Sequence, residues 1–232
     1  MLTPYENQLN KLKTRLIKMC SIVDEQVELG IDAVMSDDTS KARFVIERDS
    51  KVDKYDIKID RICQKIFALN QPVAMDLRLI MSALTINSNL ERIGDIAVNI
   101  CENYLIKGKK PHFFDRTRFS QMAEITREMI KNAIDSFIES NASMAKRVIE
   151  KDEILDKINI ENHKIMIDIM KENQDNIEEA VAYLVMCRQL ERLGDHATNI
   201  AEDVFFIVEA QTIKHNYEKY LFQDGIDDED ED

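Results

Sequence analysis

Apolar residues recur along most of this chain at the three- and four-residue intervals of an amphipathic α-helix. Within residues 1–36 these positions are Leu9, Leu12, Leu16, Ile17, Cys20, Val23 and Val27. Within residues 72–106 they are Leu90, Ile93, Ala97, Ile100 and Tyr104. A third stripe consists of Leu190, Leu193, Ala197, Ile200 and Val204. The pattern predicts long helices that each turn one face to a core.

Polar residues repeat as well, at an interval of about one hundred positions. The phrase Leu-Glu-Arg-Ile-Gly-Asp-Ile-Ala-Val-Asn-Ile at 90–100 returns as Leu-Glu-Arg-Leu-Gly-Asp-His-Ala-Thr-Asn-Ile at 190–200. The segment 45–53, Val-Ile-Glu-Arg-Asp with a further Asp four residues on, has its counterpart at 148–156. Internal repetition on this scale predicts two related halves.

Helix-end residues divide each half into three helices. Asp38 and its counterpart Asn141 suit the N-cap of the second helix. Pro72 suits the first turn of the third helix, which is expected to run to about Ile106. The fourth helix is expected to begin near Asp115, whose carboxylate would cap it.

The chain break between the halves completes the fold prediction. Gly108 and Pro111 interrupt the helical pattern, and the 107–114 segment reads as a linker. Helices of about thirty residues suit antiparallel bundles. We predict an all-α protein of two tandem three-helix bundles, whose six helices share an elongated core. The expected divisions are a first bundle at 1–110, a second bundle at 111–222 and an acidic tail at 223–232.

Composition limits the classes of partner. Only 5 glycines and 3 prolines occur among 232 residues, which leaves little turn chemistry for a many-stranded sheet. The formal net charge is −13, and the segment 224–232 carries seven of the acidic residues. This charge disfavours nucleic acid as a partner. The tail is expected to be disordered and solubilising.

Cysteine usage and hydropathy indicate the compartment. The four cysteines, Cys20, Cys63, Cys101 and Cys187, show no zinc-ligand spacing and are expected to be reduced core residues. The N-terminus has no apolar signal region, and no run of eighteen apolar residues occurs. We therefore expect a cytoplasmic protein that meets a membrane only peripherally, through partners.

Four pairs of carboxylates stand four residues apart, two pairs in each half. If the segments are helical, the members of each pair lie on one face and repel each other. Antiparallel helices joined near residue 71 place Asp49 opposite Asp95 and Asp53 opposite Glu91. The second half repeats this arrangement. The full set is Asp49, Asp53, Glu91, Asp95, Asp152, Asp156, Glu191 and Asp195.

Four carboxylates at close quarters remain ionised only if a cation or arginines compensate them. Ligation by oxygen alone favours a hard cation: Mg²⁺, Mn²⁺, Ca²⁺ or oxidised iron. Zinc prefers nitrogen and sulfur and is less favoured. Four further residues continue the same helix side and could ligate the metal or steady its ligands: Asn99, Glu102, Asn199 and Glu202.

Other interpretations of the acidic faces are open. The carboxylates could be ordinary solvated faces, paired with Arg92 and Arg192. A di-iron oxidase needs Glu-x-x-His pairs, and no histidine here has Glu three residues before it. His196 is expected to be a flanking polar residue rather than a ligand. No phosphate-binding loop, nucleophile elbow or Cys/His nucleophile pattern occurs, so an enzymatic site has no positive evidence.

The doubled phrase at 90–100 and 190–200 closely resembles the signature of the PhoU family of phosphate-signalling regulators. The segment Gln-Pro-Val-Ala-Met-Asp-Leu-Arg at 71–78 resembles a loop-to-helix segment of that family and has no counterpart in the second half. The resemblance implies two three-helix bundles, with multinuclear metal sites at E/D-x-x-x-D motifs, which match the eight carboxylates above. The acidic tail is not a hallmark of the family.

The resemblance also implies a function. The family acts as a negative regulator of phosphate uptake and of the phosphate-starvation response. It is thought to couple the ATPase subunit of a phosphate ABC transporter to a sensor histidine kinase. A non-enzymatic adaptor of this kind, with a homodimer as a further possibility, is the first hypothesis. The alternatives are a metal-dependent enzyme or metal-storage bundle, and a helical scaffold without metal.

Overall fold

The computed structural model describes residues 3–213, and every regular element within them is helical. The expectations for the acidic tail at 223–232 concern residues outside this range. The elements are α1 (Pro4–Met35), α2 (Thr39–Arg48), α3 (Ser50–Leu69), α4 (Ala74–Lys107), η1 (Phe114–Arg116), α5 (Phe119–Glu139), α6 (Ala142–Glu172), η2 (Gln174–Asn176) and α7 (Ile177–Glu209).

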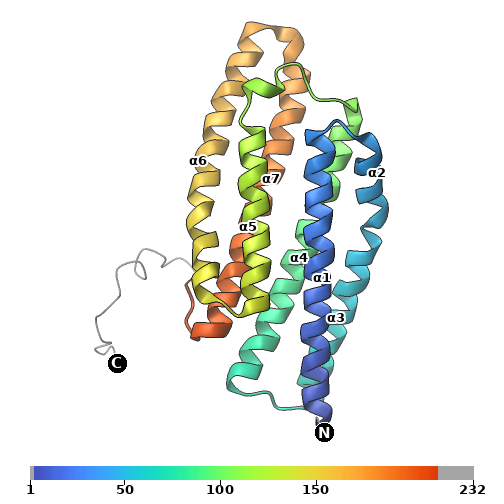
Figure 1. Cartoon of the computed structure of the whole chain (residues 1–232), viewed down its shortest axis with the longest axis vertical. Coiled ribbons are helices and arrows are strands. Elements are labelled where there is room, and N and C mark those ends of the chain that lie inside the picture. Colours follow the sequence, from blue (N-terminus) through green and yellow to red (C-terminus); the bar gives the residue numbers. More distant parts are fainter. Residues whose placement is uncertain (1–2, 214–232) are drawn as a thin grey trace, which may run out of the picture.

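Two bundles of three long helices stand side by side with their axes roughly aligned (Figure 1). The first bundle consists of α1, α4 and an interrupted helix made of α2 and α3. The second consists of α5, α6 and α7. The bundles meet mainly along α4 and α7, and also where α1 contacts α5. The predicted all-helical fold with two repeats is confirmed.

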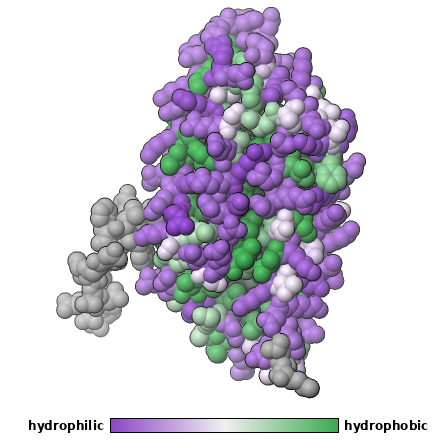
Figure 2. All heavy atoms as spheres, in the orientation of Figure 1, coloured by the Kyte–Doolittle hydropathy of each residue, from purple (hydrophilic) through white to green (hydrophobic). Residues whose placement is uncertain are grey.

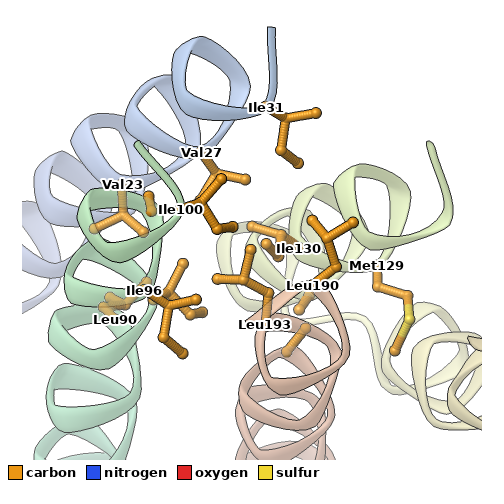
Figure 3. Packing of buried hydrophobic residues seen from close by; sticks show 14 of the residues in the cluster. Val23, Val27, Ile31, Leu90, Ile96, Ile100, Met129, Ile130, Leu190 and Leu193 are labelled. Carbon is orange, nitrogen blue, oxygen red and sulfur yellow. The ribbon is translucent and has the colours of Figure 1, made fainter. Parts of the chain in front are cut away.

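The apolar stripes of both halves meet in one core. Figure 3 shows Val23 and Val27 of α1 close to Ile100 of α4, with Ile130 of α5 and Leu193 of α7 completing the centre. All five side chains are almost fully buried. The four cysteines are buried and unpaired. The core therefore fixes the two bundles against each other.

Most predicted helix ends are observed. The Asp38 carboxylate accepts hydrogen bonds from the backbone N–H groups of Ser40 and Lys41, at 2.9 and 3.1 Å. Asn141 accepts one from the N–H of Met144 at 3.0 Å. Gly108 ends α4 with a φ of 67°, a left-handed conformation that costs glycine little.

Two predicted helix starts are wrong. The fourth long helix begins at Phe119 rather than near Asp115, which lies in the short helix η1 and caps nothing. Phe113 and Phe114 are buried against the second bundle, and this contact holds the chain in a tight turn before α5 starts. The third helix begins two residues after Pro72, because Val73 is extended.

The second helix of the first half breaks at Asp49. The Asp49 N–H donates to the Ile46 carbonyl at 3.4 Å, and the Val52 N–H donates to the Asp49 carbonyl at 2.8 Å, which are hydrogen bonds of the 3₁₀ type. The Asp49 carbonyl also accepts an α-helical hydrogen bond from the Asp53 N–H, at 3.4 Å. In the second half, α6 continues without a break through the corresponding Asp152. The halves therefore differ at an acidic position of the repeat.

None of the helices between residues 3 and 213 combines the length and the apolarity that crossing a membrane requires.

Candidate functional site: two acidic helix pairs

The glycine of the repeated motif brings the acidic helices into close contact. A Cβ atom built on Gly94 of α4 would lie 3.3 Å from Val52 and 3.6 Å from the Asp49 carboxylate in the facing helix. A Cβ atom on Gly194 of α7 would lie 3.6 Å from the Asp152 carboxylate. Because the helices approach each other this closely, a side chain larger than a methyl group would not fit between them at either position. Each motif thus sets its carboxylates against an aspartate on a neighbouring helix.

The first half assembles its four acidic residues from the junction of α2 and α3, from α3 and from α4. The pKa of Asp49 is raised, first by burial and then by the charges of Asp53 and Asp95. Gln26 of α1 lowers it in part by donating a hydrogen bond to the Asp49 carboxylate at 2.8 Å. The pKa of Glu91 is raised by burial and by Asp95, with smaller contributions from neighbours on α3.

The second half makes the same assembly between α6 and α7, and the pKa values of its carboxyl groups are raised further. Burial, with the charges of Asp156 and Asp195, raises the pKa of Asp152 to about 6. Burial, with Asp195, raises the pKa of Glu191 to about 6. Glu191 is 8% exposed, and its Oε2 atom is buried without a hydrogen-bond partner. The second set therefore carries the more poorly compensated negative charge.

Arginines compensate these carboxylates only in part. Arg92 lies 3.4 Å from Glu91 and 3.6 Å from Asp95, as the alternative interpretation expected. Arg192 makes no ion pair with a carboxylate in the range 3–213; its guanidinium donates to Gln189 at 3.3 Å instead. In the second half, Arg188 pairs with Glu191.

Residues expected beside the carboxylates divide into two groups. Asn199 and His196 turn toward α4, where both contact the Asn89 side-chain oxygen, at 3.3 and 2.8 Å. They join the two bundles, and His196 is thus a polar flanking residue. Glu202 lies close enough to raise the pKa of Asp152. Asn99 is partly buried and Glu102 is exposed on α4.

Several polar residues of the first site were not predicted. Gln26 is fully buried and bonds Asp49 from α1, which carries no part of the repeated motif. Asp56 and Asp60 continue the Asp49 and Asp53 row along α3, and both accept hydrogen bonds from Asn87, at 2.7 and 3.1 Å. The helical spacing of these aspartates could have been recognised in the sequence, whereas no sequence pattern indicated that Gln26 contacts Asp49.

The carboxylates of each helix pair lie on one face, but they do not form a complete coordination sphere for a metal ion. Across residues 3–213, no three His, Cys, Asp or Glu side chains converge as a metal centre would require. The oxygen-only donor set, the raised pKa values and the unpartnered Glu191 oxygen nevertheless match what a hard cation would stabilise. The arrangement is a concentration of negative potential on each helix pair.

We expect the metal-free protein to lose stability as pH rises from about 4 to about 6. In this window the folded state retains protons on Asp152 and Glu191 that the unfolded chain has released, so the free energy of unfolding falls with rising pH. Urea unfolding in chelator at several pH values measures it. The Asp152→Asn, Glu191→Gln variant should show a flatter dependence; an unchanged slope would contradict the raised pKa values.

The fold and the acidic faces define a class: a two-repeat helical bundle with a carboxylate-bearing motif in each repeat. The PhoU domain description matches residues 16–104 and 119–204. The chain belongs to the PhoU family. This family is non-enzymatic and consists of regulatory accessory proteins, so the enzyme alternative is not kept.

Individual relatives agree with this assignment. The phosphate-specific transport system accessory protein PhoU of Edwardsiella tarda is 32% identical over 91% of this chain and 87% of its own length. The crystal structure of PhoU from Pseudomonas aeruginosa covers 89% of this chain and 100% of its own, with a TM-score of 0.84 and 29% identity. The crystal structure of the phosphate transport system regulatory protein PhoU from Streptococcus pneumoniae covers 90% of this chain and 99% of its own, with a TM-score of 0.81 and 25% identity.

Proposed function

We propose that this protein is an accessory protein of phosphate transport that represses phosphate uptake and the phosphate-starvation response when phosphate is plentiful. The observation that carries the proposal is the match of both repeats to the PhoU domain, together with relatives that are accessory and regulatory proteins of phosphate transport. The protein acts in the cytoplasm as an adaptor. Its partners are the ATPase subunit of a phosphate ABC transporter and a sensor histidine kinase.

An exposed apolar groove supports a role that depends on protein partners. Apolar side chains gather low on the face shown in Figure 2, where the lower ends of the two bundles meet. A groove of about 290 Å³ lies among α1, α4, α5 and α7, and Ile17, Met75 and Ile138 at its edge are 40%, 61% and 46% exposed. Apolar patches of this kind mark interaction surfaces. The two halves, 1–110 and 111–222, would each contribute part of it.

A hard cation at each acidic helix pair is the finer part of the proposal. The ligands would be Asp49, Asp53, Glu91 and Asp95 in the first half, and Asp152, Asp156, Glu191 and Asp195 in the second. Iron, Mn²⁺, Mg²⁺ and Ca²⁺ suit these oxygen donors. A bound cation would relieve the repulsion between the carboxylates and brace the helix pair. The competing proposal is a scaffold that works without metal.

The regulatory role is tested by the output of phosphate-repressed genes in cells that lack this protein, grown in phosphate-rich medium. We expect constitutive expression, which the intact chain restores to the repressed level. Deletion of the partner kinase in the same cells should abolish the constitutive expression, because the adaptor acts through it. Normal repression in cells without the protein would overturn the proposed function.

The metal is tested by a double substitution in one half. Glu91→Gln with Asp95→Asn should remove the cation of the first half and leave that of the second, with helicity unchanged, because both side chains lie beside the core. Metal content after dialysis against each of the four candidate ions measures it.

A control variant carries the same chemical change elsewhere. Glu153→Gln with Asp168→Asn alters two carboxylates of α6 that are 74% and 70% exposed, and it should retain all the metal. A double variant at 91 and 95 that holds as much metal as the unaltered protein would refute the proposed ligands. If the unaltered protein holds none of the four ions, the scaffold without metal is favoured.

A further inference from the structure

Positive charge is concentrated along α1, although the protein as a whole is strongly acidic. Residues 7–23 contain four cations and no Asp or Glu, whereas the formal net charge of the chain is −13. Three of these cations stand at intervals of four and three residues, which places them on one face of the helix. They are Lys11, Arg15 and Lys18, and none is buried.

The neighbouring helix α3 separates its charges onto two faces. Asp56 and Asp60 turn toward α4, where both accept hydrogen bonds from Asn87. Four of the five cations of α3 recur every three or four residues on a different face, and all four are exposed. They are Lys54, Lys58, Arg61 and Lys65. The acidic side of α3 therefore belongs to the carboxylate site, and its basic side is available for another purpose.

The basic row of α1 and Lys58 of the α3 row border one groove. Helices α1 and α3 lie side by side (Figure 1), and a groove of about 490 Å³ opens between them. Four cations and three neutral hydrogen-bonding side chains line it: Asn10, Lys11, Thr14, Arg15, Lys18, Tyr55 and Lys58.

The cations of this groove lack acidic partners. Within the described range 3–213, none of the four makes an ion pair, whereas Lys41 and Arg48 of α2 pair with Asp32 and Glu25 of α1. Lys58 contacts only the Tyr55 ring among charged or aromatic groups in that range, with its ammonium 5.5 Å from the ring centre. Like charges at helical spacing repel each other, so a multiply charged anion would stabilise this surface.

We propose that the α1–α3 groove binds a phosphoryl-rich anion, either a soluble phosphate chain or a patch of phospholipid headgroups. Each phosphoryl group brings up to two negative charges and three strong acceptor oxygens to a small volume. The Arg15 guanidinium presents the donor fork that matches phosphate oxygens, and the lysines add point charges. The Tyr55 hydroxyl and the Asn10 side-chain amide add neutral donors, whereas the Thr14 hydroxyl donates to the Asn10 carbonyl at 2.8 Å. This site is separate from the acidic helix pairs and does not depend on the proposed regulatory function.

The first test measures binding of the full chain to short-chain inorganic polyphosphate. In the Lys11→Gln, Arg15→Gln, Lys18→Gln variant, we expect the dissociation constant to rise by about tenfold or more, because three of the four lining charges are gone. Lys58→Gln, on the opposite wall, should give a smaller rise. All three altered side chains of α1 lie on the surface, so circular dichroism should show unchanged helicity.

A matched control removes the same charge from a different helix. Lys157→Gln, Lys164→Gln and Lys171→Gln alter three exposed lysines of α6 and should change the dissociation constant by about twofold at most. Absence of polyphosphate and vesicle binding by the unaltered protein would overturn the proposal. An equal loss of binding in the control variant would also overturn it.

Two further arms identify the source of the phosphoryl groups. Vesicles of phosphatidylglycerol in phosphatidylcholine present headgroups, and polyphosphate presents a soluble chain. If the protein binds vesicles or polyphosphate, and that binding weakens in the α1 variant, the proposal is supported. The ligand that shows this loss identifies the source of the phosphoryl groups. Polyaspartate of matched charge should bind more weakly. If polyaspartate binds as tightly as polyphosphate, the groove recognises acidic peptides, and the phosphoryl assignment is wrong.

Discussion

Replacing Tyr183 with alanine should lower the free energy of unfolding by about 3–5 kcal/mol, the range for removing a large buried aromatic side chain. Tyr183 is 1% exposed on α7, and its ring lies 6.1, 5.6 and 5.3 Å from those of Phe113, Phe114 and Phe119. Phe113 and Phe114 belong to the segment that joins the two bundles, and Phe119 is the first residue of α5. Urea denaturation monitored by circular dichroism measures the loss.

The matched control for this change is Tyr183→Phe, which keeps the ring and removes the hydroxyl. The hydroxyl oxygen lies 3.3 Å from that of Thr117, so its removal should cost about 1 kcal/mol or less. If the alanine variant unfolds like the phenylalanine variant, the aromatic cluster does not anchor the linker. Because the cluster fixes where α5 starts, its loss should also weaken the contact between the two bundles.

Gly194→Ala should destabilise the protein by up to about 2 kcal/mol, even though alanine is the better helix former. The new methyl group would lie 2.5 Å from Leu155 Cδ2, and Leu155 is fully buried. Overpacking costs about 1–3 kcal/mol, and helix propensity returns about 1 kcal/mol. The displacement would also move the backbone beside Asp152, so binding of a cation in the second half should weaken as well.

The repeat supplies an internal comparison for this prediction. Gly94→Ala, at the corresponding position, meets Val52 at 3.3 Å and should be close to neutral, because a small shift relieves the contact. The double variant Gly194→Ala, Leu155→Ala should lose less stability than the sum of the two single changes, since the shortened side chain makes room for the new methyl group. Additive losses would show that Leu155 is not the obstacle.

The carboxylate rows were predictable from the sequence, and their surroundings were only partly so. Spacing of four residues places Glu91 above Asp95 in any helix, so the row follows from local geometry. Gln26 was missed because it reaches Asp49 from a helix outside the motif. The pairing of Arg188, rather than Arg192, with Glu191 depends on which side of α7 packs against α6.

The sequence by itself determined the helices, the two repeats and the family, because periodicity and motif spacing are local properties of the chain. It did not determine where α5 begins, since burial of Phe113 and Phe114 by α7 overrides the capping signal of Asp115. Tertiary structure alone decided which carboxylates are desolvated and which cations border a groove. Both depend on contacts between helices that are distant in the chain, and no local spacing encodes those contacts.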